Sequence, residues 1–134
     1  MIPFVFQLDL FRDADRAYSH RSLDILLRAL TAIDIEYLQL YPQTPMLYES
    51  GVRYQVEAPG KEEWQDIPTT LEKGVLDCED AACWRAAEVN VRYGIKAYPF
   101  FISNMRPDGS LLYHIKVRYP NGREEDPSRV LGMK

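Results

Sequence analysis

The tripeptide Pro-Asn-Gly at 120–122 constrains the fold of this chain more than any other part of its sequence. It separates two stretches of alternating polar and apolar residues, which we expect to form antiparallel strands. An Asn-Gly pair alone suggests a two-residue type I′ hairpin. With a proline ahead of it, the sequence favours a type I turn with proline at the second position, followed by Gly122 in the left-handed bulge position. We therefore predict a three-residue loop that pairs Tyr119 with Arg123.

The length of this loop decides which side chains share a face of the sheet. Counting back from the loop, Lys116 faces Asp126, and His114 lies on the same face as Lys116 because side chains alternate with period two. His114 and Asp126 are then diagonal neighbours, about 7–8 Å apart at Cα and within reach of a side-chain hydrogen bond. A two-residue loop would place Asp126 on the opposite face. We predict a His114–Asp126 pair, with Glu124 on the same face as an alternative partner.

The remaining pattern indicates one α+β domain over residues 1–134. We expect strands at 4–10, 95–103, 111–119 and 123–126, helices at 21–40 and 78–93, a helical turn at 46–50, a loop at 58–70 and an unassigned tail at 127–134. The apolar stripe of the first helix is expected to be core and consists of Leu23, Leu26, Leu27, Leu30, Ile33, Tyr37 and Leu38. The second helix is expected to begin at Cys78, behind a capping-box-like pair of Asp77 and Asp80, and to end before Gly94.

Length, charge and cysteine content narrow the class of protein. A chain of 134 residues with a formal net charge of -4 is most simply one domain without a nucleic-acid partner. Cys78 and Cys83 lie five residues apart on one predicted helix, where their side chains diverge too far for a disulfide. Free thiols favour a reducing compartment or a catalytic role. The first residues do not resemble a signal peptide and no apolar run reaches membrane-spanning length, so we expect a cytoplasmic protein without a membrane partner.

Cys78 is the candidate nucleophile, because it opens a predicted helix and is followed by His114 and Asp126 on strands. The positive end of a helix dipole and a nearby imidazole both lower the pKa of a thiol. His114 would transfer the proton, Asp126 would orient the imidazole, and the backbone N–H of Cys78 would be one oxyanion donor. The candidates for a second oxyanion donor are Trp64, Gln65 and Gln55.

Three acidic residues beside Cys78 oppose this chemistry. Negative charge from Asp77, Glu79 and Asp80 would raise the pKa of the thiol. These carboxylates would either serve the helix N-terminus or hold a hard cation such as Ca²⁺.

The stretch from Trp64 to Ala82 resembles the nucleophile motif of bacterial transglutaminase-like cysteine proteinases. It contains the Trp, the Pro, the Thr-Leu pair and the Asp-Cys-Glu-Asp core of that motif, with Leu76 where the family usually has Gly. Tyr113-His114 and Glu125-Asp126 are similar to the His and Asp strands of the family, so the resemblance covers about residues 64–127. The run is also similar to small transglutaminase-like proteins encoded by phages.

This resemblance implies a papain- or transglutaminase-like core, in which the Cys78 helix packs on a small antiparallel sheet that carries His114 and Asp126. It implies a cysteine-dependent acyl-transfer enzyme that cleaves or exchanges a peptide or amide bond of a protein or peptide substrate through a Cys thioester. No cofactor is required for this chemistry. Calcium bound by Asp77 and Glu79 is implied by the periplasmic members of the family, and a phage-encoded origin by the small relatives.

Two other classes of function fit the same sequence. One is a non-catalytic transglutaminase-like module in phage or virion assembly or in binding, which Leu76 and the acidic neighbours of the thiol favour. The other is a calcium-dependent regulator. A zinc site is disfavoured because Cys78, Cys83 and His114 lack a fourth ligand and the usual paired spacing. Cys83 is expected to fill space in the core or at the surface, and His20 to lie at the surface. Glu124 and Glu125 are expected mostly to form a solvated edge.

Overall fold

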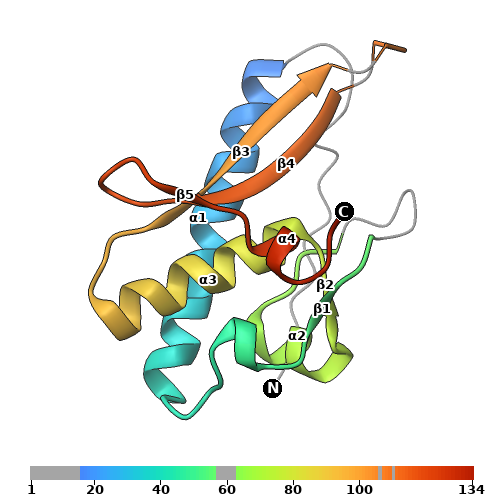
Figure 1. The fold of residues 1–134 in the computed structure, drawn as a ribbon. Coiled ribbons are helices and arrows are strands. Elements are labelled where there is room, and N and C mark those ends of the chain that lie inside the picture. Colours follow the sequence, from blue (N-terminus) through green and yellow to red (C-terminus); the bar gives the residue numbers. More distant parts are fainter. Residues whose placement is uncertain (1–15, 57–62, 106, 110) are drawn as a thin grey trace.

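The computed structural model describes residues 16–56, 63–105, 107–109 and 111–134, which form a mixed helical and stranded structure. The strand expected at 4–10 lies outside the described residues. Helix α3 (Cys78–Tyr93) crosses the middle of the molecule, as Figure 1 shows. On one side of it lies an antiparallel sheet in the order β3 (Tyr98–Met105), β4 (Leu111–Arg118) and β5 (Glu124–Glu125). On the other side lie helix α2 (Ile67–Lys73) and the parallel pair β1 (Arg53–Tyr54) and β2 (Val75–Leu76).

Helix α3 contacts both halves of the core because its buried residues are mostly small. The alanines at 81, 82, 86 and 87 are fully buried, and small side chains let neighbouring elements approach a helix axis closely. One apolar cluster joins α3 to the β3–β4 sheet and to the first half of helix α1 (Arg16–Leu40). A second cluster, around Trp84, joins α3 to the second half of α1 and to the β1–β2 region. The start of α3, which carries Cys78, is therefore held from two sides.

Helix α1 begins five residues before the expected start and ends at the expected residue, Leu40. Most of its predicted apolar stripe is buried, but Ile33 is 43% exposed and the next residue, Asp34, is fully buried. The buried positions include Leu27, Leu30, Asp34 and Leu38, which follow one another at steps of three and four residues. The prediction that Ile33 is a core residue was wrong, because the next residue, Asp34, takes the buried position on this face of α1.

Helix α2 was not expected, since residues 58–70 were assigned to a loop. Its signals are present in the sequence: Asp66 caps the helix by accepting a hydrogen bond from the N–H of Thr69, and Pro68 lies in the first turn. Gly74 ends the helix with φ 77°, a left-handed conformation that favours glycine. The helix then leads directly into β2 and Cys78.

The three-residue hairpin loop is confirmed. The N–H of Tyr119 donates to the carbonyl of Arg123 at 2.8 Å, and Gly122 adopts φ 87°. Arg118 pairs with Glu124 and Val117 with Glu125, which is the predicted register.

The tail contains a short helix, α4 (Pro127–Val130), which packs against α3. Beyond it the carbonyl of Leu131 accepts a hydrogen bond from the N–H of Tyr54 in β1. None of the described helices combines the length and the apolar character needed to cross a membrane.

Candidate active site

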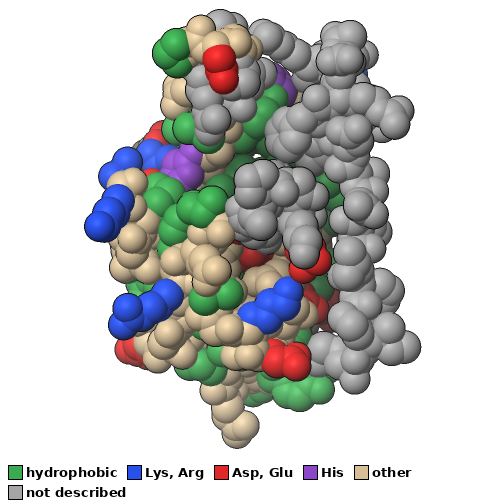
Figure 2. All heavy atoms as spheres, turned by 90° about the vertical axis from the view of Figure 1, so that its right-hand side faces the viewer, with side chains coloured by type: hydrophobic (Ala, Val, Ile, Leu, Met, Phe, Trp, Pro, Cys, Tyr) green, Lys and Arg blue, Asp and Glu red, His purple; other side chains and the backbone are tan. Residues whose placement is uncertain are grey.

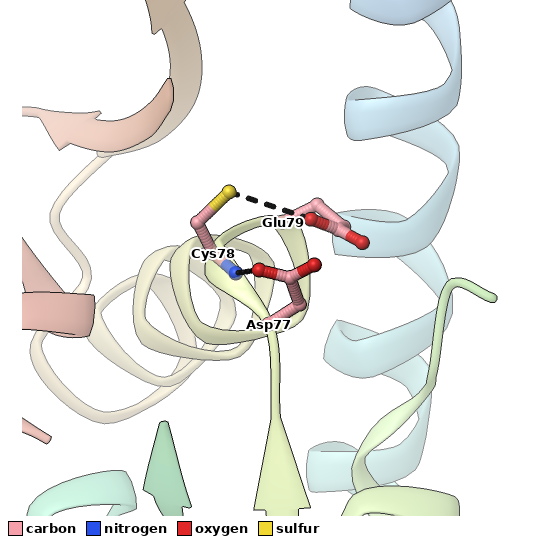
Figure 3. Close-up of side chains that lie close together, drawn as sticks. All are labelled: Asp77, Cys78 and Glu79. Carbon is pink, nitrogen blue, oxygen red and sulfur yellow. Dashed lines mark hydrogen bonds between the residues drawn. The ribbon is translucent and has the colours of Figure 1, made fainter. Parts of the chain in front are cut away.

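Cys78 is the first residue of α3, and the capping box predicted for this helix is present. The N–H of Asp77 donates to Oδ2 of Asp80 at 3.1 Å. The N–H of Cys78 donates to Oδ1 of Asp77 at 2.7 Å, a contact drawn in Figure 3. The backbone donor expected to bind an oxyanion is therefore occupied by a carboxylate in this arrangement.

Asp80 also fixes the segment that precedes α2, which contains Gln65, one of the three candidates for a second oxyanion donor. Its Oδ1 accepts the backbone N–H of Gln65 at 2.7 Å. The side-chain amide of Gln65 is directed to the carbonyl of Val75 at 3.1 Å and to the hydroxyl of Thr70 at 3.3 Å. Gln65 is buried and its amide donates hydrogen bonds within the fold, so Gln65 is the least suited of the three candidates for a second oxyanion donor.

The other two candidate donors differ in their surroundings. Trp64 is partly buried and packs against the same apolar cluster as Cys78. Gln55 is exposed, and its backbone N–H donates to the carbonyl of Leu76. Trp64 thus shares its packing environment with the thiol.

His114 and Asp126 are paired, as the hairpin register predicted. Nε2 of His114 lies 2.8 Å from Oδ2 of Asp126, and Nε of Arg129 lies 3.4 Å from the same oxygen. The side chain of His114 keeps 20% of its surface exposed, and Figure 2 shows a face on which histidine side chains reach the surface beside hydrophobic and basic ones. Because Nε2 is engaged by Asp126, Nδ1 is the ring nitrogen that remains for proton transfer with another group.

The start of α3 lies at the edge of β4 next to His114. Alternate N–H groups of an antiparallel strand point to the same neighbour, so the N–H groups of Tyr119, Val117 and Ile115 all point to the β5 side. β5 ends at Glu125, opposite Val117, which leaves the N–H of Ile115 directed beyond the end of that strand. There it interacts with the sulfur of Cys78 and acts to lower the thiol pKa.

The thiol is hydrogen-bonded to a carboxylate rather than to the imidazole. Sγ of Cys78 donates to Oε2 of Glu79 at 3.4 Å, as Figure 3 shows. Burial raises the pKa of Cys78 well above its usual range, and the charges of Glu79 and Asp77 raise it further. These effects raise the pKa of Cys78 more than the N–H of Ile115 lowers it, so Cys78 is a neutral thiol in the resting state.

Tyr54 is a residue of this site that the sequence did not indicate. It pairs with Leu76 in the parallel β1–β2 register and so lies beside Asp77. Burial raises the pKa of Tyr54 to about 12, and the charge of Asp77 and a hydrogen bond to it contribute in the same direction. Burial likewise raises the pKa of Asp77, although the hydrogen bonds from Cys78 and Tyr54 act against that rise. A two-residue strand has no detectable sequence pattern, so nothing in the sequence pointed to Tyr54.

The ligand atoms of Asp77, Cys78 and Glu79 lie within 4.8 Å of one another, which makes them a candidate metal-binding group. Calcium takes six to eight oxygen ligands. The two carboxylates already accept hydrogen bonds from the N–H and the thiol of Cys78, and the third ligand atom is sulfur. This donor set does not fit calcium, so no chemical step is assigned to a metal ion.

Four other expectations can be compared with the structure. Cys83 is fully buried in the core, as expected. Glu124 binds Lys116 and Arg118 rather than His114. The assignment of Glu125 to a solvated edge was wrong, because it lies in a partly buried ion pair with Arg85. His20, expected at the surface, is half-buried: its ring packs edge-on against aromatic neighbours, and Nε2 lies 3.1 Å from the hydroxyl of Tyr113.

Comparisons with protein-family models, with curated proteins and with solved structures give no match for this chain. The transglutaminase-like classification therefore stays a prediction from the motif around Cys78.

Proposed function

We propose that this chain is a transglutaminase-like, cysteine-dependent acyl-transfer domain that acts on a peptide, amide or isopeptide bond. The observation that carries the proposal is the 2.8 Å contact between Nε2 of His114 and Oδ2 of Asp126. His114 lies on β4, the strand whose edge adjoins the start of the Cys78 helix. The Asp-Cys-Glu-Asp motif supports it, since the thiol opens a helix as the motif requires.

In the proposed reaction His114 acts as a general base during attack, because the resting thiol is neutral. Sγ of Cys78 forms a bond to the substrate carbonyl carbon while Nδ1 of His114 takes the thiol proton. Asp126 holds the imidazole through Nε2 and stabilises its charged form. The tetrahedral intermediate collapses as the C–N bond breaks and the leaving amine takes the proton from His114, which leaves a Cys78 thioester. Water or an amine then attacks the thioester and returns a proton to the thiolate through His114.

The N–H of Cys78 must change its partner in this reaction. It donates to Asp77 in the resting arrangement, and the substrate oxygen would replace that carboxylate as the acceptor. Binding of substrate is thus coupled to a small movement of the Asp77 side chain.

Acylation by p-nitrophenyl acetate tests the proposal directly. The chain contains two cysteines, so mass spectrometry of peptides assigns any acetyl group to Cys78 or to Cys83. We expect release of p-nitrophenol and an acetyl group on Cys78 in the parent and in Cys83→Ala, and neither in Cys78→Ala. His114→Ala should slow acylation by about 10²- to 10⁴-fold, the usual contribution of a general base. Acylation that is equal in parent and Cys78→Ala, or unaffected by loss of His114, contradicts the proposal.

A second candidate function is a non-catalytic module of the same fold, acting in phage or virion assembly or in binding. It is favoured by the raised pKa of Cys78 and by the carboxylate on its N–H. Acylation by p-nitrophenyl acetate separates the two functions, since both leave Cys78 a neutral thiol that iodoacetamide alkylates slowly near pH 6. A folded parent protein in which Cys78 is not acylated supports the non-catalytic module.

A further inference from the structure

Glu125 lies at the centre of a partly buried hydrogen-bond network one residue before Asp126. Its carboxylate accepts a bifurcated hydrogen bond from the single Nε–H of Arg85, at 3.0 and 3.2 Å, and one from the hydroxyl of Tyr48 at 2.5 Å. The hydroxyl of Tyr119 donates to the same carboxylate. Each oxygen of the Glu125 carboxylate therefore has two hydrogen-bond contacts, supplied by three donor groups.

The network joins Glu125 to the helix of the candidate nucleophile. Arg85 lies on α3, and its Nη1 also binds Oε2 of Glu88 at 2.8 Å. The other oxygen of Glu88 accepts the backbone N–H of Leu47 at 2.9 Å. Leu47 begins the short 3₁₀ helix η1 (Leu47–Glu49), which also carries Tyr48. Two segments that are distant from Glu125 in sequence, α3 and η1, thus converge on the residue next to Asp126.

Asp126 has few contacts of its own to hold it in place. Its side chain makes no capping hydrogen bond to α4, and Oδ1 is buried without a hydrogen-bond partner among the described residues. The contacts of Oδ2 are with His114 and with Arg129, whose side chain is 66% exposed. β5 pairs with β4 through two residues only, so the strand is too short to fix the residue that follows it.

We propose that Glu125 and Arg85 are a positioning pair that sets the place of Asp126, and through it of His114, relative to the Cys78 helix. The pair spans the junction between α3 and β5, and a half-buried carboxylate that accepts from one charged and two hydroxyl donors has one favoured position. This role rests on the proposed acyl-transfer function. Glu125 and Arg85 touch neither the thiol nor the imidazole, so they are not catalytic residues.

The test uses Glu125→Gln, with Glu124→Gln as the matched control. Both variants remove one negative charge from β5, but Glu124 forms exposed ion pairs with Lys116 and Arg118. Arg85 keeps Glu88 as a partner in Glu125→Gln, so the variant does not leave an orphaned buried charge. We expect acylation of Cys78 to slow by about tenfold to hundredfold in Glu125→Gln, since a misplacement of about 1 Å costs on the order of 10²-fold. Glu124→Gln should react at the parental rate.

The NMR signals of the histidine side chains distinguish a positioning role of Glu125 from a role in stability alone. The chain has two histidines, His20 and His114, so the imidazole signals can be assigned with one histidine variant. We expect Glu125→Gln to change the ¹⁵N shifts of His114 and to leave those of His20 unchanged. A lower melting temperature with parental His114 signals overturns the proposal. This measurement does not need turnover, so its failure is distinct from failure of the acyl-transfer proposal.

A double-mutant cycle tests whether the two residues act as one unit. We expect Arg85→Gln, Glu125→Gln and the double variant to slow acylation to a similar extent, because removal of either partner breaks the pair. Independent effects that multiply in the double variant contradict a pair. If Glu125→Gln does not fold, Tyr48→Phe and Tyr119→Phe each remove one donor to Glu125 without a charge change. The same shift of the His114 signals is expected in both, and its absence overturns the proposal.

Discussion

The N–H of Cys78 donates to Oδ1 of Asp77 at 2.7 Å, so the residue before the candidate nucleophile occupies the donor that the proposed mechanism assigns to a substrate oxygen. The same carboxylate raises the pKa of the thiol, behind burial and Glu79. Asp77 therefore caps the helix and restrains the cysteine with one side chain.

Asp77→Ser should make the thiol more reactive. Serine keeps an N-cap acceptor for α3 but removes the charge, so the thiolate is less disfavoured. We expect alkylation of Cys78 by iodoacetamide at pH 7 to be about tenfold faster, the effect of about one unit in the pKa. The control is Asp66→Ser, which changes the acidic N-cap of α2. Equal alkylation rates in the parent and Asp77→Ser would contradict the restraint.

Glu79→Gln should shift the pH profile of alkylation. Glu79 is, after burial, the largest cause of the raised thiol pKa, and its charge favours the protonated form. Without that charge the pKa of Cys78 falls, so the rise in alkylation rate moves to lower pH. The amide oxygen of glutamine can still accept from the thiol. Glu72→Gln, an exposed change on α2, should leave the profile in place; a profile unmoved by Glu79→Gln would rule out the carboxylate as a cause.

Asp34 should make stability depend on pH. Burial raises the pKa of Asp34 well above its usual range, and the charges of Asp66 and Asp80 add to the rise, while the N–H of Ile67 acts against it. The folded state then retains a proton that the unfolded state loses. The stability from Asp34 is thus present below about pH 4, the ordinary Asp pKa, and is lost as the pH rises toward the folded-state pKa.

Asp34→Asn removes this titration and keeps an acceptor for the N–H of Ile67. We expect its free energy of unfolding to exceed that of the parent by an amount that grows above about pH 4. Asp24→Asn, at an exposed site on the same helix, should show no such trend. Urea unfolding between pH 3 and 8 measures both variants, and a difference that is constant with pH would disprove the assignment.

Gly122→Ala should destabilise the hairpin that holds Asp126 opposite His114. Gly122 has φ 87°, and a Cβ in the left-handed region costs about 1–2 kcal/mol. Gly122→Asn is the matched variant, because asparagine adopts this region more readily and should cost less. Urea unfolding gives the two values, and equal losses would argue against a conformational cause.

Calcium should leave the melting temperature unchanged within about 1 °C, because a ligand stabilises only by binding the folded state. The control is EDTA, and the measurement is a thermal scan with Ca²⁺ at 0 and 5 mM, on the order of the weakest extracellular sites. A saturable rise that Asp77→Asn abolishes would show that Asp77 does bind Ca²⁺.

The hairpin was predictable because its determinants are local. The proline and glycine of the 120–122 turn select the loop length, and the period-two alternation then carries that choice to His114 and Asp126. The start of α3 was predictable for the same reason, since a capping box lies within four residues. Helix α2 could also have been predicted, because Asp66, Pro68 and Gly74 are ordinary signals for the start and the end of a helix.

The sequence by itself determined the pair of His114 and Asp126 and the place of Cys78 at a helix start, because neighbouring residues fix both through turn and cap geometry. Only the tertiary structure decided that Glu125 binds Arg85 and Tyr48, which lie 40 and 77 residues away. It also decided that Tyr54 lies beside Asp77 and that Gln65 is hydrogen-bonded to Asp80 and Val75. Such contacts depend on how α3 packs against separate segments, and packing of segments distant in the chain leaves no periodic or local pattern in the sequence.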